Sequence, residues 1–70
     1  MPIIITSHAK KRMIDRGINF KQIQQTIEMP DYTVKKEQKT EAYKRHDGKM
    51  LKVVYAVQDK YIKVITLMWK

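Results

Sequence analysis

The spacing of hydrophobic positions changes near the middle of the chain. Up to Pro30 the apolar residues recur at intervals of three and four, which is typical of amphipathic helices. From Asp31 onward they tend to alternate with polar residues, which is typical of β-strands. The pattern predicts an α+β fold in which two N-terminal helices pack on an antiparallel sheet of three to four strands.

The start of the chain carries clear signals for a short strand and a first helix. Residues 3–5 are isoleucines, which favour extended backbone. Thr6 and Ser7 are both suitable helix caps, so we expect a helix to start at His8, with Ser7 assigned to the cap. The helix should end at Gly17, because glycine tolerates the left-handed conformation that closes a helix.

A second helix is expected directly after a tight corner. Ile18 can fold back on Met13, and Asn19 can cap the second helix with Gln22 completing a capping box. Pro30 ends this helix, since the residue before a proline is pushed out of the helical region. Its apolar positions are Phe20, Ile23 and Ile27.

The strands begin after this proline. Residues 32–36 are either a short strand or an extended linker, and the polar run 35–40 has too few apolar residues to be placed. Asp47 and Gly48 are a strong signal for a two-residue hairpin turn, because both positions of a type I′ turn need positive φ. This turn pairs His46 with Lys49.

A second tight turn at residues 59–60 would pair Gln58 with Tyr61, with a three-residue loop as the alternative. A slip of one residue would exchange the two faces of the sheet. In this register the face that helices can cover carries Ala42, Leu51, Val53, Tyr55, Val57, Ile62, Val64 and Met68. The open face carries Tyr43, Arg45, Met50, Lys52, Val54, Tyr61, Lys63, Ile65, Leu67 and Trp69.

The net charge of the chain indicates what kind of partner it binds. The 70 residues include 15 Lys and Arg against 7 Asp and Glu, for a net charge of +8. Such a surplus favours polyanions: phosphate backbones such as RNA first, acidic proteins second and anionic lipid third. The alternative is that lysines simply keep a small domain in solution. No apolar run is long enough for a membrane span or a signal peptide, so we expect a cytoplasmic protein without membrane contact.

The first candidate site is a row on the first helix. His8, Arg12 and Arg16 are four residues apart, so they should project side by side. No acidic residue has the spacing to neutralise both arginines, which makes an external anion an attractive partner. The helix dipole favours neutral imidazole at His8, the form that a general base needs. The alternative is an ordinary solvated helix face.

The second candidate site is the open sheet face near the hairpin. Tyr43 and Arg45 share that face, Arg45 lies diagonally across from Lys52, and His46 stands beside the turn. Cations mixed with aromatic rings suit single-stranded nucleic acid, and Tyr61 and Lys63 extend this candidate binding surface. The alternative is that the rings of Tyr43, Tyr61 and Trp69 pack against the terminal segment or against a second copy of the protein. We favour this alternative for Trp69, because terminal aromatic residues often anchor a last strand or an interface.

Several other chemistries are excluded by the residue inventory. The chain has no cysteine and only two histidines, and it lacks a glycine-rich phosphate loop, an HExxH motif and a carboxylate cluster suited to magnesium. We therefore expect neither a cofactor nor a metal.

The stretch HAxxRMxxRGI, followed by a helix, a proline and later strands ending in VIT, carries a resemblance. It resembles a family of small bacterial and archaeal domains catalogued as a domain of unknown function, which is similar to the RelE/ParE-like fold that includes the BrnT toxins. The resemblance spans nearly the whole chain. It implies an α+β domain and kinship with metal-independent endoribonucleases that an antitoxin holds inactive. Only His8, Arg12 and Arg16 carry over by motif.

The leading hypothesis is an RNA-directed, toxin-like endoribonuclease in which a ribose 2′-hydroxyl attacks its own phosphate without metal. His8 would take the proton, and the charge that builds on the phosphorane would be stabilised by Arg12, Arg16 and Arg45. Tyr43 or His46 would donate the proton to the leaving group.

Two other interpretations remain open. The chain is a non-catalytic module that binds nucleic acid or an acidic protein such as an antitoxin, or it is a structural homodimer that pairs through the open sheet face.

Overall fold

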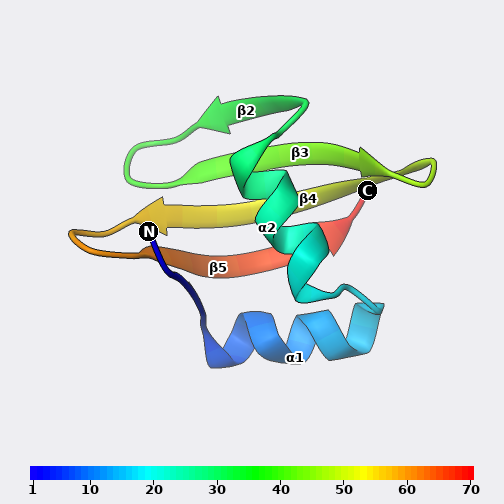
Figure 1. Ribbon diagram of the computed structural model, residues 1–70, viewed down its shortest axis with the longest axis horizontal. Coiled ribbons are helices and arrows are strands. Elements are labelled where there is room, and N and C mark those ends of the chain that lie inside the picture. The colour runs from blue at the N-terminus through cyan, green and yellow to red at the C-terminus, as the bar shows by residue number, and fades with distance from the viewer.

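A computed structural model describes residues 1–70 and contains two helices and one five-stranded sheet. The elements follow one another as β1 (Ile3–Ile5), α1 (Ser7–Arg16), α2 (Phe20–Glu28), β2 (Tyr32–Lys35), β3 (Thr40–His46), β4 (Lys49–Val57) and β5 (Ile62–Trp69). Figure 1 shows α2 crossing in front of the sheet and α1 running beside its β5 edge. The α+β class predicted from the sequence is confirmed.

The sheet is mixed rather than antiparallel, and its strand order is β1-β5-β4-β3-β2. The three isoleucines of β1 pair in parallel with the start of β5, while the other neighbouring strands are antiparallel. The expectation of three to four antiparallel strands was therefore wrong. Residues 32–35 form a strand rather than a linker. The parallel pairing of β1 could not be predicted, because its partner β5 lies at the other end of the chain and such a pairing leaves no local signal in the sequence.

Helix α1 is closed at both ends by the expected kinds of contact, but its cap is a different residue. The backbone N–H of Ala9 donates to Thr6 Oγ1 at 3.1 Å, so Thr6 is the cap, and Ser7 is the first helical residue. At the other end Gly17 has φ 63°, and the Ile18 N–H donates to the Met13 carbonyl at 2.9 Å. The predicted end of the helix is confirmed.

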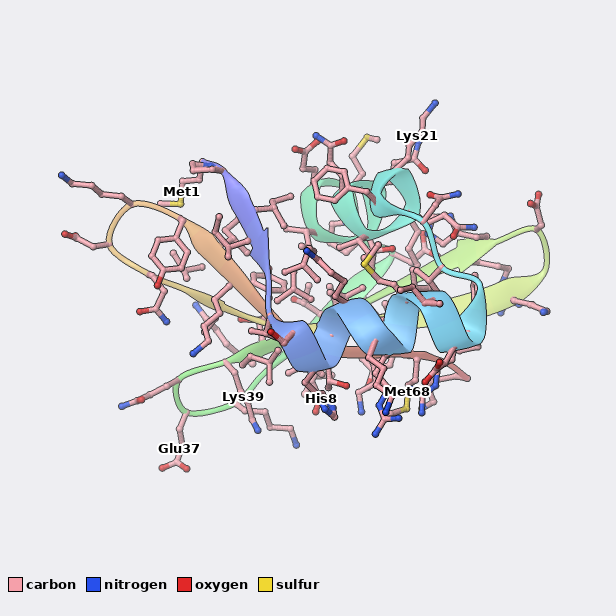
Figure 2. The ribbon with its side chains drawn as sticks, turned by 90° about the horizontal axis from the view of Figure 1, so that it is seen from below. Met1, His8, Lys21, Glu37, Lys39 and Met68 are labelled. Atoms are coloured by element: carbon pink, nitrogen blue, oxygen red, sulfur yellow. The ribbon has the colours of Figure 1, made fainter.

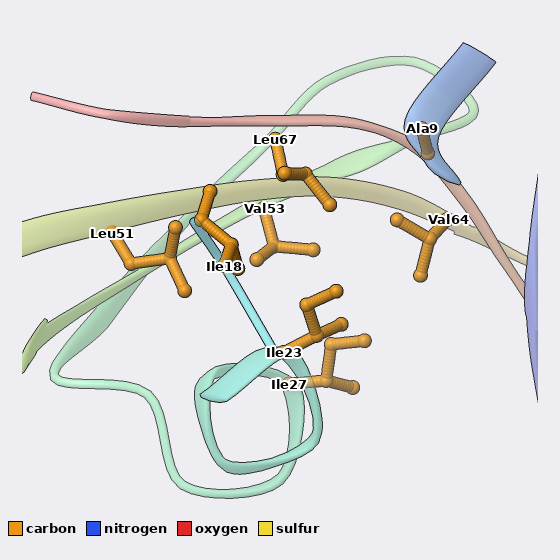
Figure 3. Close-up of a cluster of buried hydrophobic side chains, with 8 residues drawn as sticks. All are labelled: Ala9, Ile18, Ile23, Ile27, Leu51, Val53, Val64 and Leu67. Carbon is orange, nitrogen blue, oxygen red and sulfur yellow. The ribbon is translucent and has the colours of Figure 1, made fainter. Parts of the chain in front are cut away.

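Helix α2 has the predicted capping box, in which Asn19 and Gln22 exchange side-chain and backbone hydrogen bonds. Its buried side differs in part from the prediction, because Thr26 is buried and Phe20 is 44% exposed. The helix packs over β3 and β4 (Figure 1). The core between helices and sheet consists of Ala9, Ile18, Ile23, Ile27, Leu51, Val53, Val64 and Leu67 (Figure 3).

Both predicted tight turns are confirmed. Asp47 and Gly48 have φ of 51° and 83°, and β3 and β4 pair from His46 and Lys49 onward. At the other turn the Gln58 N–H donates to the Tyr61 carbonyl at 2.8 Å.

A β-bulge in β5 changes which side chains reach the core. Tyr55 pairs with Val64 but Val54 pairs with Thr66, so Ile65 is an extra residue without a partner on β4. Because side chains alternate along a strand, one extra residue moves everything after it to the other face.

The residues after the bulge were therefore assigned to the wrong faces. Leu67 lies opposite Val53 and is 0% exposed, and Figure 3 shows both on the side where Ile23 lies. Trp69 also packs against the core, as favoured, although on the opposite face from the one predicted. Met68 pairs with Lys52 and lies on the face without helices.

No helix in the structure has the length and the apolar character needed to cross a membrane.

The bulge predicts opposite outcomes for two neighbouring substitutions. Leu67→Ala should lower the free energy of unfolding by about 2 to 5 kcal/mol, because it leaves a cavity in the core. Met68→Ala should cost about 1 kcal/mol or less, since its side chain lies outside the core. Urea unfolding of both variants would measure this difference, and a larger loss for Met68→Ala would contradict the observed register.

Candidate nucleic-acid interface

Only one face of the sheet is covered by a helix. We call the other the uncovered face, and it consists of Tyr32, Val34, Glu41, Tyr43, Arg45, Met50, Lys52, Val54, Ala56, Lys63, Ile65, Thr66 and Met68. Figure 2 shows Lys21 of α2 on one side of the molecule, with His8, Lys39 and Met68 on the opposite side. The uncovered face is thus flanked by the first turn of α1 and by the loop between β2 and β3.

The predicted row on α1 forms a track beside β5. His8 and Arg16 are exposed, whereas Arg12 is half-buried. At a rise of about 1.5 Å per residue, the row is roughly 12 Å long from its first to its last member. Its three side chains therefore line a path and do not surround one phosphate.

Arg16 also has a structural role. One guanidinium nitrogen, Nη1, donates to the Leu67 carbonyl at 2.7 Å, and the Trp69 indole N–H donates to the Arg16 carbonyl at 2.8 Å. These two hydrogen bonds connect the end of α1 to the second half of β5, which has no pairing with β1. Removing Arg16 would thus affect folding as well as charge.

Arg45 does not lie close to the row of His8, Arg12 and Arg16 on α1. It lies on β3, with β4 and β5 between it and the helix, and its guanidinium donates to the Gly48 carbonyl at 3.3 Å. Neighbouring strands are about 4.8 Å apart, so β3 lies about 10 Å from β5 before the distance to α1 is added. Arg45 can contact a long ligand that also reaches α1, but not the same phosphoryl group.

Tyr43 is the centre of a packed cluster on the uncovered face. Its ring stacks on Tyr32 with centroids 4.5 Å apart, and the ammonium groups of Lys52 and Lys70 lie 5.9 and 5.3 Å from its centroid. Its hydroxyl donates to Glu41 at 3.1 Å. The side chain is only 5% exposed, so its ring is not free to stack on a base.

The same cluster shifts two pKa values in opposite directions. Burial, the hydrogen bond to Glu41 and the nearby carboxylate charge raise the pKa of Tyr43. Burial also opposes the charged form of Glu41, but the Tyr43 hydrogen bond and the charges of Lys52 and Lys36 outweigh it and lower the pKa of that carboxyl. A phenol with a raised pKa is a poorer proton donor, which weakens the role considered for Tyr43.

His46 faces the helix-covered side. Its Nε2 lies 2.9 Å from Thr26 Oγ1 on α2, and its ring meets Trp69 edge-on with centroids 6.5 Å apart. The sheet therefore lies between His46 and the uncovered face. Its contacts are those of a packed polar residue at the end of a strand.

Lys52, Tyr61 and Lys63 lie at the positions that the predicted strand register gave them. Lys63 is exposed on the uncovered face opposite Ala56, and Tyr61 is 36% exposed beside the turn into β5. Lys52 is half-buried, and its ammonium group lies 3.7 Å from the Glu41 carboxylate. The structure thus joins Lys52 to the tyrosine cluster and leaves Lys63 free for other partners.

Sequence reasoning missed a hollow of about 510 Å³ at one end of the uncovered face. It is lined by Lys36, Glu37, Gln38, Lys39, Ala56, Gln58 and Ile65. Four of these seven residues come from the polar run that could not be placed. The others are Ala56 near the end of β4, Gln58 just after it and Ile65 within β5. Only the mixture of lysines and amides in that run hinted at binding. No three His, Cys, Asp or Glu side chains gather to form a metal site.

Comparison with known proteins gives one match. The model of a family described as "Domain of unknown function (DUF4258)" matches residues 5–69. No curated protein and no solved structure matches the chain.

The Glu41 carboxylate predicts a stability change in acid. As the pH falls, the unfolded carboxyl takes up a proton before the folded one, because the folded pKa is lower. The stability that Glu41 contributes is therefore present above the unfolded pKa and is lost as the pH falls through the folded pKa. Urea unfolding between neutral pH and about pH 3 should show this loss in the wild type and a smaller loss in Glu41→Gln.

Tyr43→Phe provides a second variant for this experiment. It removes the hydrogen bond to the carboxylate and keeps the ring, so its acid-induced loss should be intermediate. An identical pH dependence in all three proteins would show that the cluster does not stabilise the ionised carboxylate.

Proposed function

We propose that this chain, which belongs to the DUF4258 family, binds single-stranded RNA along the uncovered face and the flanking row of α1. The observation that carries the proposal is the excess of cations over carboxylates on this one side. These cations are His8 when protonated, Arg12, Arg16, Lys36, Lys39, Arg45, Lys52, Lys63 and Lys70. Of the acidic residues, Glu37 and Glu41 lie on this side, and Asp15 lies on α1 three residues after Arg12.

The arrangement of these cations favours a flexible strand over a compact anion. The α1 row and Arg45 lie on different sides of β4 and β5, so only a partner that extends across the sheet meets both. Apolar side chains on the same face, including Ile65 and Met68, lie among the cations and suit bases more than an acidic peptide. An unpaired strand exposes its bases and carries a phosphate at every nucleotide, so it fits both features.

RNA cleavage is a second candidate function, and the position of His8 favours it. His8 is exposed one helical turn before Arg12 and points to the side of the uncovered face (Figure 2). In this reaction the 2′-oxygen attacks the adjacent phosphorus while His8 accepts the hydroxyl proton, and the 5′-oxygen leaves. Arg12 would stabilise the charge on the phosphorane. The leaving oxygen would take its proton from water, because Tyr43 and His46 are engaged elsewhere.

A matched pair of lysine substitutions tests the binding face. Lys63→Gln removes a cation from the uncovered face, whereas Lys21→Gln removes an exposed one from α2 on the opposite side. For a mixed-sequence single-stranded RNA, Lys63→Gln should reduce the slope of log affinity against log salt by about 1, and Lys21→Gln should leave the slope unchanged. Fluorescence anisotropy at several salt concentrations measures both slopes. Equal effects of the two substitutions would contradict the assignment of the face.

The cleavage candidate is tested by incubating a mixed RNA pool with the wild type and with His8→Ala in EDTA. If His8 is the general base, the substitution should slow cleavage by about 10²- to 10⁴-fold while leaving RNA affinity nearly intact. Lys10→Ala, which removes a charge from the same helix, serves as the control. Tight RNA binding by the wild type without cleavage would contradict the cleavage candidate and support RNA binding as the only function of the two.

A further inference from the structure

The hollow at the end of the uncovered face has the composition of a small-molecule site. Its volume of about 510 Å³ lies within the range of about 300 to 1,000 Å³ that is usual for ligand pockets. Ala56 and Ile65 supply apolar surface, whereas Gln38 and Gln58 supply amide groups that both donate and accept hydrogen bonds.

We propose that this hollow holds one base of the bound RNA strand, an inference that rests on the proposed function. A base has two apolar faces and an edge of alternating donors and acceptors, so it needs apolar contact and amide partners together. Side-chain amides pair with base edges in this way. Lys36 and Lys39 at the same hollow are placed for the phosphates on either side of that base.

The local backbone explains why the hollow exists. The bulge adds Ile65 to the uncovered face beside Thr66, and the short side chain of Ala56 on β4 leaves space next to it. The loop from β2 to β3 is closed by the Lys36 N–H, which donates to the Lys39 carbonyl at 2.8 Å. This bond holds the loop as a turn whose side chains form the remaining wall.

The hollow also adjoins the row on α1. The Thr6 hydroxyl donates to the Ile65 carbonyl at 3.4 Å, and the Thr6 N–H donates to the Val64 carbonyl at 3.3 Å. His8 is only two residues farther along the chain, and it projects to the side of the uncovered face (Figure 2). A strand with one base in the hollow can therefore continue along β5 past His8 and Arg12.

A titration monitored by amide NMR of the full chain tests the base itself. Uridine, cytidine, adenosine and guanosine monophosphates are compared with ribose 5-phosphate, which carries the same sugar and phosphate without a base. We expect shifts at Gln38, Ala56 and Gln58 with at least one nucleotide, and none there with ribose 5-phosphate. Equal shifts with ribose 5-phosphate would show an anion site and overturn the proposal.

Substitutions test the hollow in the context of RNA. The double variant Gln38→Ala/Gln58→Ala removes both amides without filling the space, and it should weaken binding of single-stranded RNA about tenfold. Gln25→Ala, on α2 across the sheet, is the matched control and should bind as the wild type does. An unchanged affinity in the double variant would overturn the subsite.

The two proposals fail in different ways. If the wild type binds RNA with a steep salt dependence but the double variant does too, the subsite is wrong and the RNA function stands. If the wild type binds no RNA yet nucleotides shift the residues of the hollow, the site is one for free nucleotides and the RNA function is wrong. The absence of both signals overturns both.

Discussion

The arrangement of both sheet faces depends on the one extra residue in β5. Val64 before the bulge and Leu67 after it reach the same core, which a regular strand would not allow for residues three positions apart. This arrangement leaves Ile65 without a partner on β4, and its carbonyl instead accepts a hydrogen bond from the Thr6 hydroxyl. The bulge thus completes the core on one side and creates a hollow on the other.

The position of α1 follows from the same strand. β1 pairs with only the first part of β5, and beyond it the open edge is covered by α1. Arg16 donates to a carbonyl that a neighbouring strand would otherwise engage, and Trp69 returns a hydrogen bond to the helix. Covering an edge in this way protects it from pairing with other chains. It also leaves α2 alone on the sheet, so the second face stays without a helix.

Electrostatics then gives the uncovered face its character. The charge of Lys52 is balanced by the Glu41 carboxylate, and its ammonium group lies over the Tyr43 ring. The charges of Lys63 and of the α1 row have no such ion pair. The row was predicted from spacing alone, because helical periodicity places residues four apart on one side. Its relation to Arg45 could not be predicted in the same way, since it depends on the number of strands between them. A row and a distant arginine suit an extended ligand better than a single reacting phosphate.

Local signals in the sequence were sufficient for the α+β class, the C-terminal ends of both helices, the capping box at Asn19 and both tight turns. These features depend on a few neighbouring residues, whose backbone preferences act over one turn of chain. The parallel pairing of β1, the bulge at Ile65 and the hollow lie beyond such signals. Each arises from packing between segments far apart in the chain, where the burial of Leu67 and Trp69 outweighs the regular alternation of a strand.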